Sequence, residues 1–274
     1  MRPKCWIAGW MLMMVLGLVA CDQGAPAAPA AETTPAASAP KPKPAASEEI
    51  NLRIEKRTEV LKREDREADI HYPVFSGLPP AILKELDASA GLKAGTGSSL
   101  EEWKAEFQES WWLVEIDYEV TYNRHDLLCL TYSIDGMGAH PSTSTEDLAA
   151  DLKTGRRLAA RDLFKPVSLE ELAAKVDRLR VAAVEKAIQE NRAFLEENDM
   201  TEEDLLATME PAKQRRFGVE NLDSFRLDDK GVTFVRDFEF PHVHQALEPD
   251  GEFFLSYEEL RPYVNPEGPL ARIR

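Results

Sequence analysis

The sequence of residues 48–274 predicts an α+β fold, in which antiparallel hairpins form one or more sheets and a long amphipathic helix packs on one face. Residues 112–122 alternate apolar and polar side chains, as expected of a strand with one face on a core and one in solvent. Residues 172–187 instead carry apolar side chains every three or four positions, which is the spacing of a helix that covers a sheet.

The first half of the fold, residues 48–155, is expected to consist mainly of strands. Alternation and turn residues predict strands at 50–54, 68–75, 112–122, 128–134 and 142–150, and a helix at 81–88. The first strand is expected to fray into the charged run 55–66. The turn Asn123–Asp126 joins its flanking strands into an antiparallel hairpin. The core face of the 112–122 strand is expected to carry the even positions, Trp112, Val114, Ile116, Tyr118, Val120 and Tyr122.

The second half, residues 156–274, is expected to pack with the first as one unit. Ser168-Leu169-Glu170-Glu171 reads as a capping box that starts the long helix, and Leu172, Val176, Leu179, Ala183 and Ala187 form its apolar stripe. A shorter helix is expected from Thr201, and a last one from the cap Ser256. The remaining expected elements are a hairpin of 224–227 and 232–240 turned by 228–231, and a short strand at 253–255.

The N-terminus has the pattern of a bacterial lipoprotein. Residues 1–20 combine a basic start, an apolar run too short to span a bilayer and a small-residue cleavage site, as in a signal peptide. Leu18-Val19-Ala20-Cys21 resembles a lipobox, which implies that Cys21 is acylated and anchors the chain in the bilayer. Residues 21–47 are rich in alanine and proline and read as a semi-rigid tether, long enough to hold the fold up to ~80 Å from the lipid.

Location, cysteine use and charge narrow the function classes. Lipidation places the protein in the bacterial cell envelope facing the periplasm, and Asp22 after the cysteine favours the inner membrane. Cleavage removes Cys5, so Cys129 is the one remaining thiol, and we interpret it as a small buried hydrophobe. The net charge of −16 argues against nucleic-acid partners and favours a cationic partner, although solubility alone also explains an acidic chain.

Histidines supply the candidate metal ligands. His242 and His244 stand two apart, so a strand there would project both imidazoles to one side, and His140 could complete the set. The alternative is a solvated strand edge, and no catalytic residue or cofactor is predicted. Gly138, Ala139 and His140 are candidate ligand contacts, as is the outward-facing Trp111. We explain the glycines near His140, at 136 and 138, by the backbone freedom that a tight turn requires.

A series of short motifs resembles one family. The motifs are Tyr118–Asn123, Gly138–Pro141, Asp151–Gly155 with Asp162–Phe164, Phe225–Gly231 and Phe254–Leu260. In order and spacing they resemble the paired extracytoplasmic domains of unknown function found in the anti-sigma factor RsiV, before the deacetylase domain of PdaC, and in many bacterial lipoproteins. The resemblance implies an envelope-facing binding module, and in RsiV the domain senses lysozyme. Because the signal starts at residue 1 and nothing follows the module, neither a sigma-factor-binding segment nor a deacetylase domain is expected.

The sequence therefore favours a non-enzymatic, lipid-anchored binding module whose ligand is a cationic protein of the lysozyme type or a cell-wall component. The alternative is a metal-dependent or hydrolytic enzyme that acts on peptidoglycan through His140, His242 and His244. A structural subunit of an envelope complex is a third possibility. The sequence does not give the oligomeric state.

Overall fold

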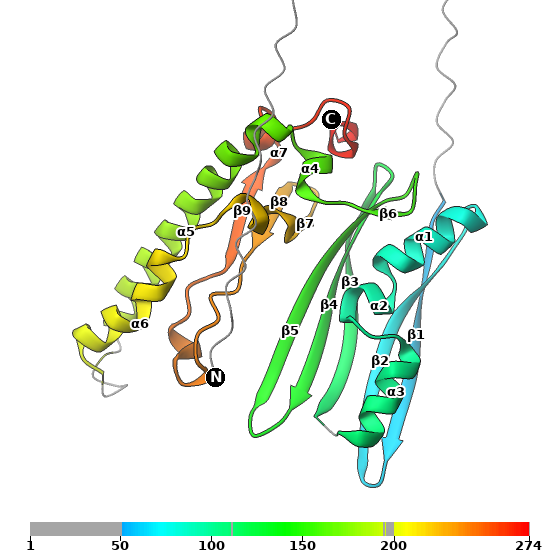
Figure 1. The fold of residues 1–274 in the computed structure, drawn as a ribbon, viewed down its shortest axis with the longest axis horizontal. Coiled ribbons are helices and arrows are strands. Elements are labelled where there is room, and N and C mark those ends of the chain that lie inside the picture. The colour runs from blue at the N-terminus through cyan, green and yellow to red at the C-terminus, as the bar shows by residue number, and fades with distance from the viewer. Residues whose placement is uncertain (1–50, 111, 194, 196–199, 274) are drawn as a thin grey trace, which may run out of the picture. The chain divides into compact units, whose positions relative to one another are not determined.

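The computed structural model describes residues 51–110, 112–193, 195 and 200–273, except the side chains of His242 and Val243 (Figure 1). The chain divides into two units, 1–46 and 47–274, and all of the described residues belong to the second. This unit has the α+β architecture that the sequence predicts, with a six-stranded sheet, a three-stranded sheet and a long helix.

The six-stranded sheet follows the order of the chain. Its strands are β1 Arg53–Arg63, β2 Arg66–Ser76, β3 Leu113–Arg124, β4 Leu127–Met137, β5 Pro141–Asp151 and β6 Arg156–Arg157. All neighbours are antiparallel except β2 and β3, which pair in parallel over a short stretch. The parallel pair arises because three helices separate these strands and return the chain in the same direction. They are α1 Pro80–Ala90, α2 Leu92–Thr96 and α3 Leu100–Glu109.

The charged run after residue 54 is part of a strand, which corrects the expectation that the strand frays there. β1 pairs with β2 along its whole length, from Arg53 to Arg63. Backbone hydrogen bonds therefore hold this strand despite its polar side chains. Its charges are matched across strands, as in the Lys62–Glu67 ion pair of 2.6 Å. Charged side chains suit β1 because it is the edge of the sheet, where an apolar strand would invite further pairing.

Helices cover one face of the six-stranded sheet, and the second half packs against part of the other face. On one face Ile70, Ile116 and Leu128 pack in a hydrophobic cluster with residues of α1, α2 and α3. On the other face Leu127 and Cys129 join the cluster of the second half. Successive residues of β4 thus enter opposite clusters, as the pleat of a strand requires. Cys129 is 1% exposed, which confirms that it is a small buried hydrophobe.

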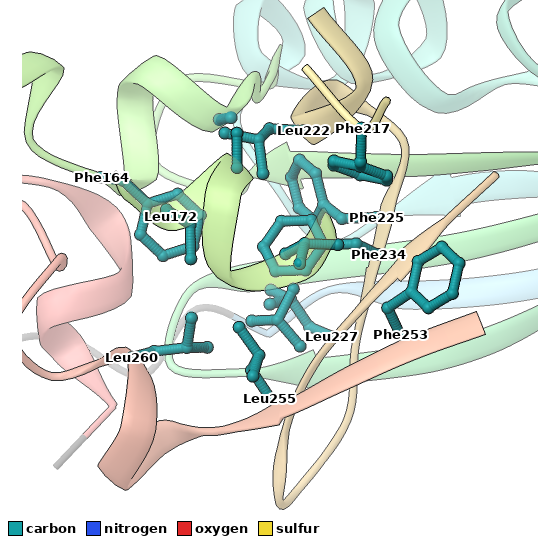
Figure 2. Packing of buried hydrophobic residues seen from close by; sticks show 14 of the residues in the cluster. Phe164, Leu172, Phe217, Leu222, Phe225, Leu227, Phe234, Phe253, Leu255 and Leu260 are labelled. Carbon is teal, nitrogen blue, oxygen red and sulfur yellow. The ribbon is translucent and has the colours of Figure 1, made fainter. Parts of the chain in front are cut away.

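The second half builds its own layer beside this face. Its helices are α4 Ala160–Leu163, α5 Leu169–Arg192, α6 Glu202–Gln214 and α7 Tyr257–Leu260, and its strands are β7 Phe225–Leu227, β8 Gly231–Val235 and β9 Glu252–Ser256. Four 3₁₀ turns complete it: η1 Pro166–Ser168, η2 Val219–Asp223, η3 His242–Leu247 and η4 Pro269–Arg272. Figure 2 shows its core, in which Phe164, Phe225 and Phe234 pack against Leu172 of α5 and Leu227 of β7.

Two details of α5 differ from the sequence prediction. The helix begins at Leu169 as expected, but Ser168 ends a 3₁₀ turn in a helical conformation and its hydroxyl caps nothing, so the capping box is wrong. Leu179 is 36% exposed, whereas Arg180 is 1% exposed. Arg180 is buried because α6 packs on this side of α5 and the guanidinium bonds to Asp177 and to the carbonyl of Ala212.

The alternation of β3 is interrupted twice. The register with β4 shifts between Leu113 and Glu115 and again between Val120 and Tyr122. Each shift lets an extra residue bulge out of the pairing and changes which face the following side chains take. Val120 pairs with Leu130 before the second shift and keeps the face of Ile116, although it is 38% exposed; after the shift, Tyr122 is buried in the opposite cluster from Ile116. The prediction that all even positions share one core face is therefore wrong at Val114, which is 44% exposed, and at Tyr122, while Val120 lies on that face without being buried.

The C-terminal hairpin is shorter than the sequence predicts. Its second arm, β8, ends at Val235 rather than at residue 240. Glu239 has a φ of 56°, which lies outside the extended region of a regular strand, and Pro241 removes a backbone donor. The helices predicted from Thr201 and from Ser256 form, each with a reciprocal capping box.

Candidate functional site

The predicted contact residues Gly138, Ala139 and His140 form the exposed tip of the β4–β5 hairpin. Neither Gly136 nor Gly138 has a positive φ, which corrects the explanation from backbone freedom. A Cβ at Gly136 would lie 2.6 Å from the indole of Trp112, so this glycine is required by packing. A Cβ at Gly138 would meet nothing within 4 Å. Packing therefore requires a glycine at position 136, whereas nothing around position 138 requires one.

The predicted histidine metal site assumed a strand at residues 242–244, and this assumption is wrong. His242 and His244 lie in the 3₁₀ turn η3 and not in a strand. With three residues per turn, positions two apart point to different sides, so the argument from strand alternation does not apply. The side chain of His242 lies outside the described part of the structure. His244 is half-buried and lines a shallow groove beside α6 with Asp204 and Pro211.

Two further predicted site residues, Cys21 and Trp111, lie outside the described residues. Their roles in lipidation and in ligand contact stay predictions.

A pocket of about 640 Å³ lies where the β3–β4 turn meets the second half, and we name it the junction pocket. Its polar lining is Tyr122, Arg124, His125, Lys165, Asp229, Tyr257 and Arg261. Its apolar lining is Val264, Pro266, Leu270, Ala271 and Ile273. An apolar wall with a few converging polar groups is the usual composition of a small-molecule site, and the volume is in the usual range of several hundred Å³.

The β3–β4 turn that enters this pocket has an uncommon backbone. His125 and Asp126 have φ values of 56° and 59°, which side-chain-bearing residues seldom adopt. The turn holds the His125 imidazole against the Tyr122 ring, and Nδ1 lies 2.6 Å from the Tyr122 hydroxyl. The bulge after Val120 is what turns Tyr122 to this side of the sheet. Local backbone geometry thus positions two ring systems at the mouth of the pocket.

Both tyrosines of the junction pocket are neutral phenols at physiological pH. Burial, followed by the nearby Asp229 carboxylate, raises the pKa of Tyr122 to about 12. Burial is also the main cause that raises the pKa of Tyr257, whose hydroxyl donates to the carbonyl of Asp228 at 2.7 Å. Neither tyrosine adds charge to the pocket, whose charged side chains include two arginines, one lysine and Asp229.

A second concavity, of about 360 Å³, lies between α5 and β9, and we name it the acidic groove. Its carboxylates are Glu190, Glu248, Asp250 and Glu252, and its one cation is Lys186. Phe254 and Leu179 line it and are 44% and 36% exposed. Burial raises the pKa of Glu248, which accepts a hydrogen bond from the backbone of Phe238 at 3.0 Å. The groove thus combines negative charge with exposed apolar surface.

One group of side chains in the described residues has the spacing of a metal site, namely His71, Glu115 and Asp117. The sequence did not suggest it, because the parallel β2–β3 pairing brings it together. His71 Nε2 lies 3.2 Å from Glu115, and Nδ1 lies 2.8 Å from the Thr58 hydroxyl. Lys56 lies 2.6 Å from Asp117, so a cation of this chain already balances that carboxylate. We interpret the group as an ion-pair network on the sheet surface.

Sequence reasoning missed both concavities. The alternation of residues 112–122 predicts Tyr122 on the same core face as Ile116, and nothing in the sequence relates Tyr122 to the residue after the cap Ser256, Tyr257. The one local signal was the polar turn 123–126 at the end of a long hairpin. It indicates where the hairpin turns but not which residues of the second half lie beside it.

No helix in the described part of the chain has the length and apolar character needed to cross a bilayer. No family model matches the sequence. No curated protein matches it. Among solved structures, the chain is similar to a member of the DUF3298 family from Bacteroides fragilis, at 14% identity and a TM-score of 0.50, with 83% of this chain and 99% of that one covered. A DUF3298 family protein from Pseudomonas aeruginosa gives 15% identity and a TM-score of 0.48, with 80% and 96% covered. The chain therefore shares its fold with a domain family of unknown function.

Proposed function

We propose that this chain is a non-enzymatic, lipid-anchored module of the cell envelope that binds a cationic protein of the lysozyme type through the acidic groove. The observation that carries the proposal is the acidic groove itself, which four carboxylates and an exposed phenylalanine, Phe254, line together. Exposed aromatic side chains are the usual anchors of protein interfaces, and surrounding charges select the partner by sign.

Two carboxylates of the groove have no cation partner among the described residues, which supports a basic binding partner. Glu252 pairs with Arg226, and Glu190 lies 3.6 Å from Lys186. Asp250 and Glu248 have no cation partner among the described residues, and Asp250 accepts only from the backbone of Glu252 at 2.9 Å. Lysine or arginine side chains of a partner would supply the missing positive charge. With the net charge of −16, such a partner would also be attracted over a long range.

Calorimetry with a cationic lysozyme at low and moderate salt tests this function. We expect binding that weakens as salt rises, because salt screens charges at the rim of an interface. Phe254→Ser and Asp250→Asn should each weaken it, since the first removes the apolar anchor and the second a free charge. The matched controls are Val167→Ser, at an exposed valine, and Asp65→Asn in the β1–β2 turn. Absence of salt-sensitive binding, or equal losses in the controls, would reject the groove as a lysozyme site.

The lipid anchor is tested separately in the natural host. Wild-type protein should incorporate an alkyne-labelled fatty acid and partition with membranes, whereas Cys21→Ser should do neither. If the serine variant stays labelled and membrane-bound, the anchor is not Cys21.

A further inference from the structure

The junction pocket has the opposite charge to the rest of the chain. Its cations are Arg124, Lys165 and Arg261, and its one carboxylate is Asp229. The whole chain carries −16, so a positively charged concavity is a local inversion. A cleft lined by one sign of charge concentrates ions of the other sign. The pocket therefore favours anions, in contrast to the acidic groove.

The three cations of the pocket differ in how many hydrogen-bond or ion-pair partners they have within the described part of the chain. Arg124 pairs with Asp229 at 2.9 Å. Lys165 donates to the carbonyl of Pro262 at 2.7 Å, which leaves donors of its ammonium group unused. The guanidinium of Arg261 has no partner among the described residues. Two of the three cations thus keep donors for an incoming anion.

The remaining wall is apolar and well supported. Val264, Leu270 and Ile273 come from the C-terminal segment, and Leu270 is 2% exposed. Arg272 fixes this segment to the six-stranded sheet through Asp151. Val264 and Ile273 are only half-buried, so an inorganic anion would leave them uncovered, whereas an anion with an apolar body would cover them and gain the free energy of apolar burial.

We propose that the junction pocket binds a small organic anion in which a carboxylate is joined to an apolar chain or ring. The carboxylate lies against Arg261 and Lys165, and the apolar body lies against the half-buried Val264 and Ile273. The neutral hydroxyls of Tyr122 and Tyr257 border the same space and do not repel an anion. This site is separate from the acidic groove, so it does not depend on the proposed protein partner.

Ligand-observed NMR and calorimetry on the mature protein test the ligand class with four probes. Octanoate joins a carboxylate to an apolar chain, and 3-phenylpropionate joins one to an apolar ring. Comparing the two distinguishes a fatty acid from an aromatic acid. Acetate lacks the apolar body, and octanamide lacks the charge. We expect binding of octanoate, of 3-phenylpropionate or of both, and much weaker binding of acetate and octanamide. Equal binding of octanamide, or no binding of either acid at millimolar concentration, overturns the proposal.

A matched pair of variants assigns the binding to this pocket. Arg261→Gln should weaken binding of the acid about tenfold, as expected for the loss of one charge-assisted hydrogen bond. Arg178→Gln removes the same charge from the exposed surface of α5, outside the pocket, and should leave binding unchanged. Both side chains are exposed and have no ion-pair partner in the described part of the chain, so both variants should fold. Equal effects of the two substitutions would show that the acid binds elsewhere.

Loss of lysozyme binding in Phe254→Ser with octanoate binding retained would separate the two sites. Loss of octanoate binding in Arg261→Gln with lysozyme binding retained would also separate them. Failure of one proposal therefore leaves the other testable.

Discussion

Arg272 donates to both carboxylate oxygens of Asp151, at 2.8 and 3.0 Å, and so joins the C-terminal turn η4 to the end of β5. The same guanidinium donates to the carbonyl of Asp126 in the β3–β4 turn, at 3.3 Å. One side chain therefore ties the last turn of the second half to two strand ends of the six-stranded sheet. The neighbouring residues Ala271 and Ile273 line the junction pocket, so this contact fixes the segment that carries them.

The first prediction concerns this ion pair. Arg272→Gln should lower the free energy of unfolding by about 1–3 kcal/mol, because Asp151 is 8% exposed and would keep a poorly solvated charge. Urea denaturation at neutral pH measures the change. Arg178→Gln, at an exposed arginine, is the control and should stay within about 0.5 kcal/mol of wild type. A loss for Arg272→Gln as small as the control's would show that the pair contributes no net stability.

The second prediction separates the two glycines before His140. Gly136→Ala should destabilise the protein by about 1–3 kcal/mol, since its Cβ would lie 2.6 Å from the Trp112 indole. Gly138→Ala should be neutral or slightly stabilising, because nothing lies within 4 Å and the backbone there is accessible to alanine. Urea denaturation of both variants tests this, and equal destabilisation would contradict it.

The third prediction is a pH dependence that comes from Asp147. This carboxylate is 8% exposed, and burial raises its pKa above the ordinary aspartate value, although the Thr131 hydroxyl donates to it at 2.5 Å. Just above the ordinary aspartate pKa, the native state therefore binds more protons than the unfolded state. The free energy of unfolding that Asp147 contributes must fall as pH rises through this window.

Asp147→Asn lacks this titration and gives the measurement. The difference in free energy of unfolding, wild type minus variant, should decrease from acidic toward neutral pH. Asp65→Asn, at an exposed residue, should show no such slope. A difference for Asp147→Asn that rises with pH would reverse the sign and reject the argument.

The fourth prediction is that Cys129 is inert in the native protein. Burial raises the pKa of its thiol to about 12, and it is 1% exposed, so almost no reactive thiolate is present or accessible. Alkylation of the native protein followed by peptide mass spectrometry should find Cys129 unmodified, whereas alkylation in denaturant should modify it fully. Rapid native labelling would show that the cluster around Cys129 opens.

How far the sequence predicted the fold depended on how local each signal was. The hairpin of β3 and β4, the helix from Thr201 and the cap at Ser256 were predicted because each is encoded by adjacent residues. The capping box at Ser168 failed because the pattern does not reveal a preceding 3₁₀ turn. The charged strand β1 was underestimated because its pairing comes from β2 and not from its own side chains.

The candidate sites were less accessible to sequence reasoning. The sequence by itself determined the α+β class and the acidity of the chain, since these follow from periodicity and composition, and it indicated the burial of Cys129 because a free cysteine usually behaves as a small hydrophobe. The tertiary structure alone decided that a bulge turns Tyr122 away from the face of Ile116 and toward Tyr257 and Arg261. It also decided that Phe254 lies exposed among the carboxylates of α5 and the β9 region. The physical reason is that one extra residue in a strand reverses the faces after it, and that a pocket is formed by residues far apart along the chain.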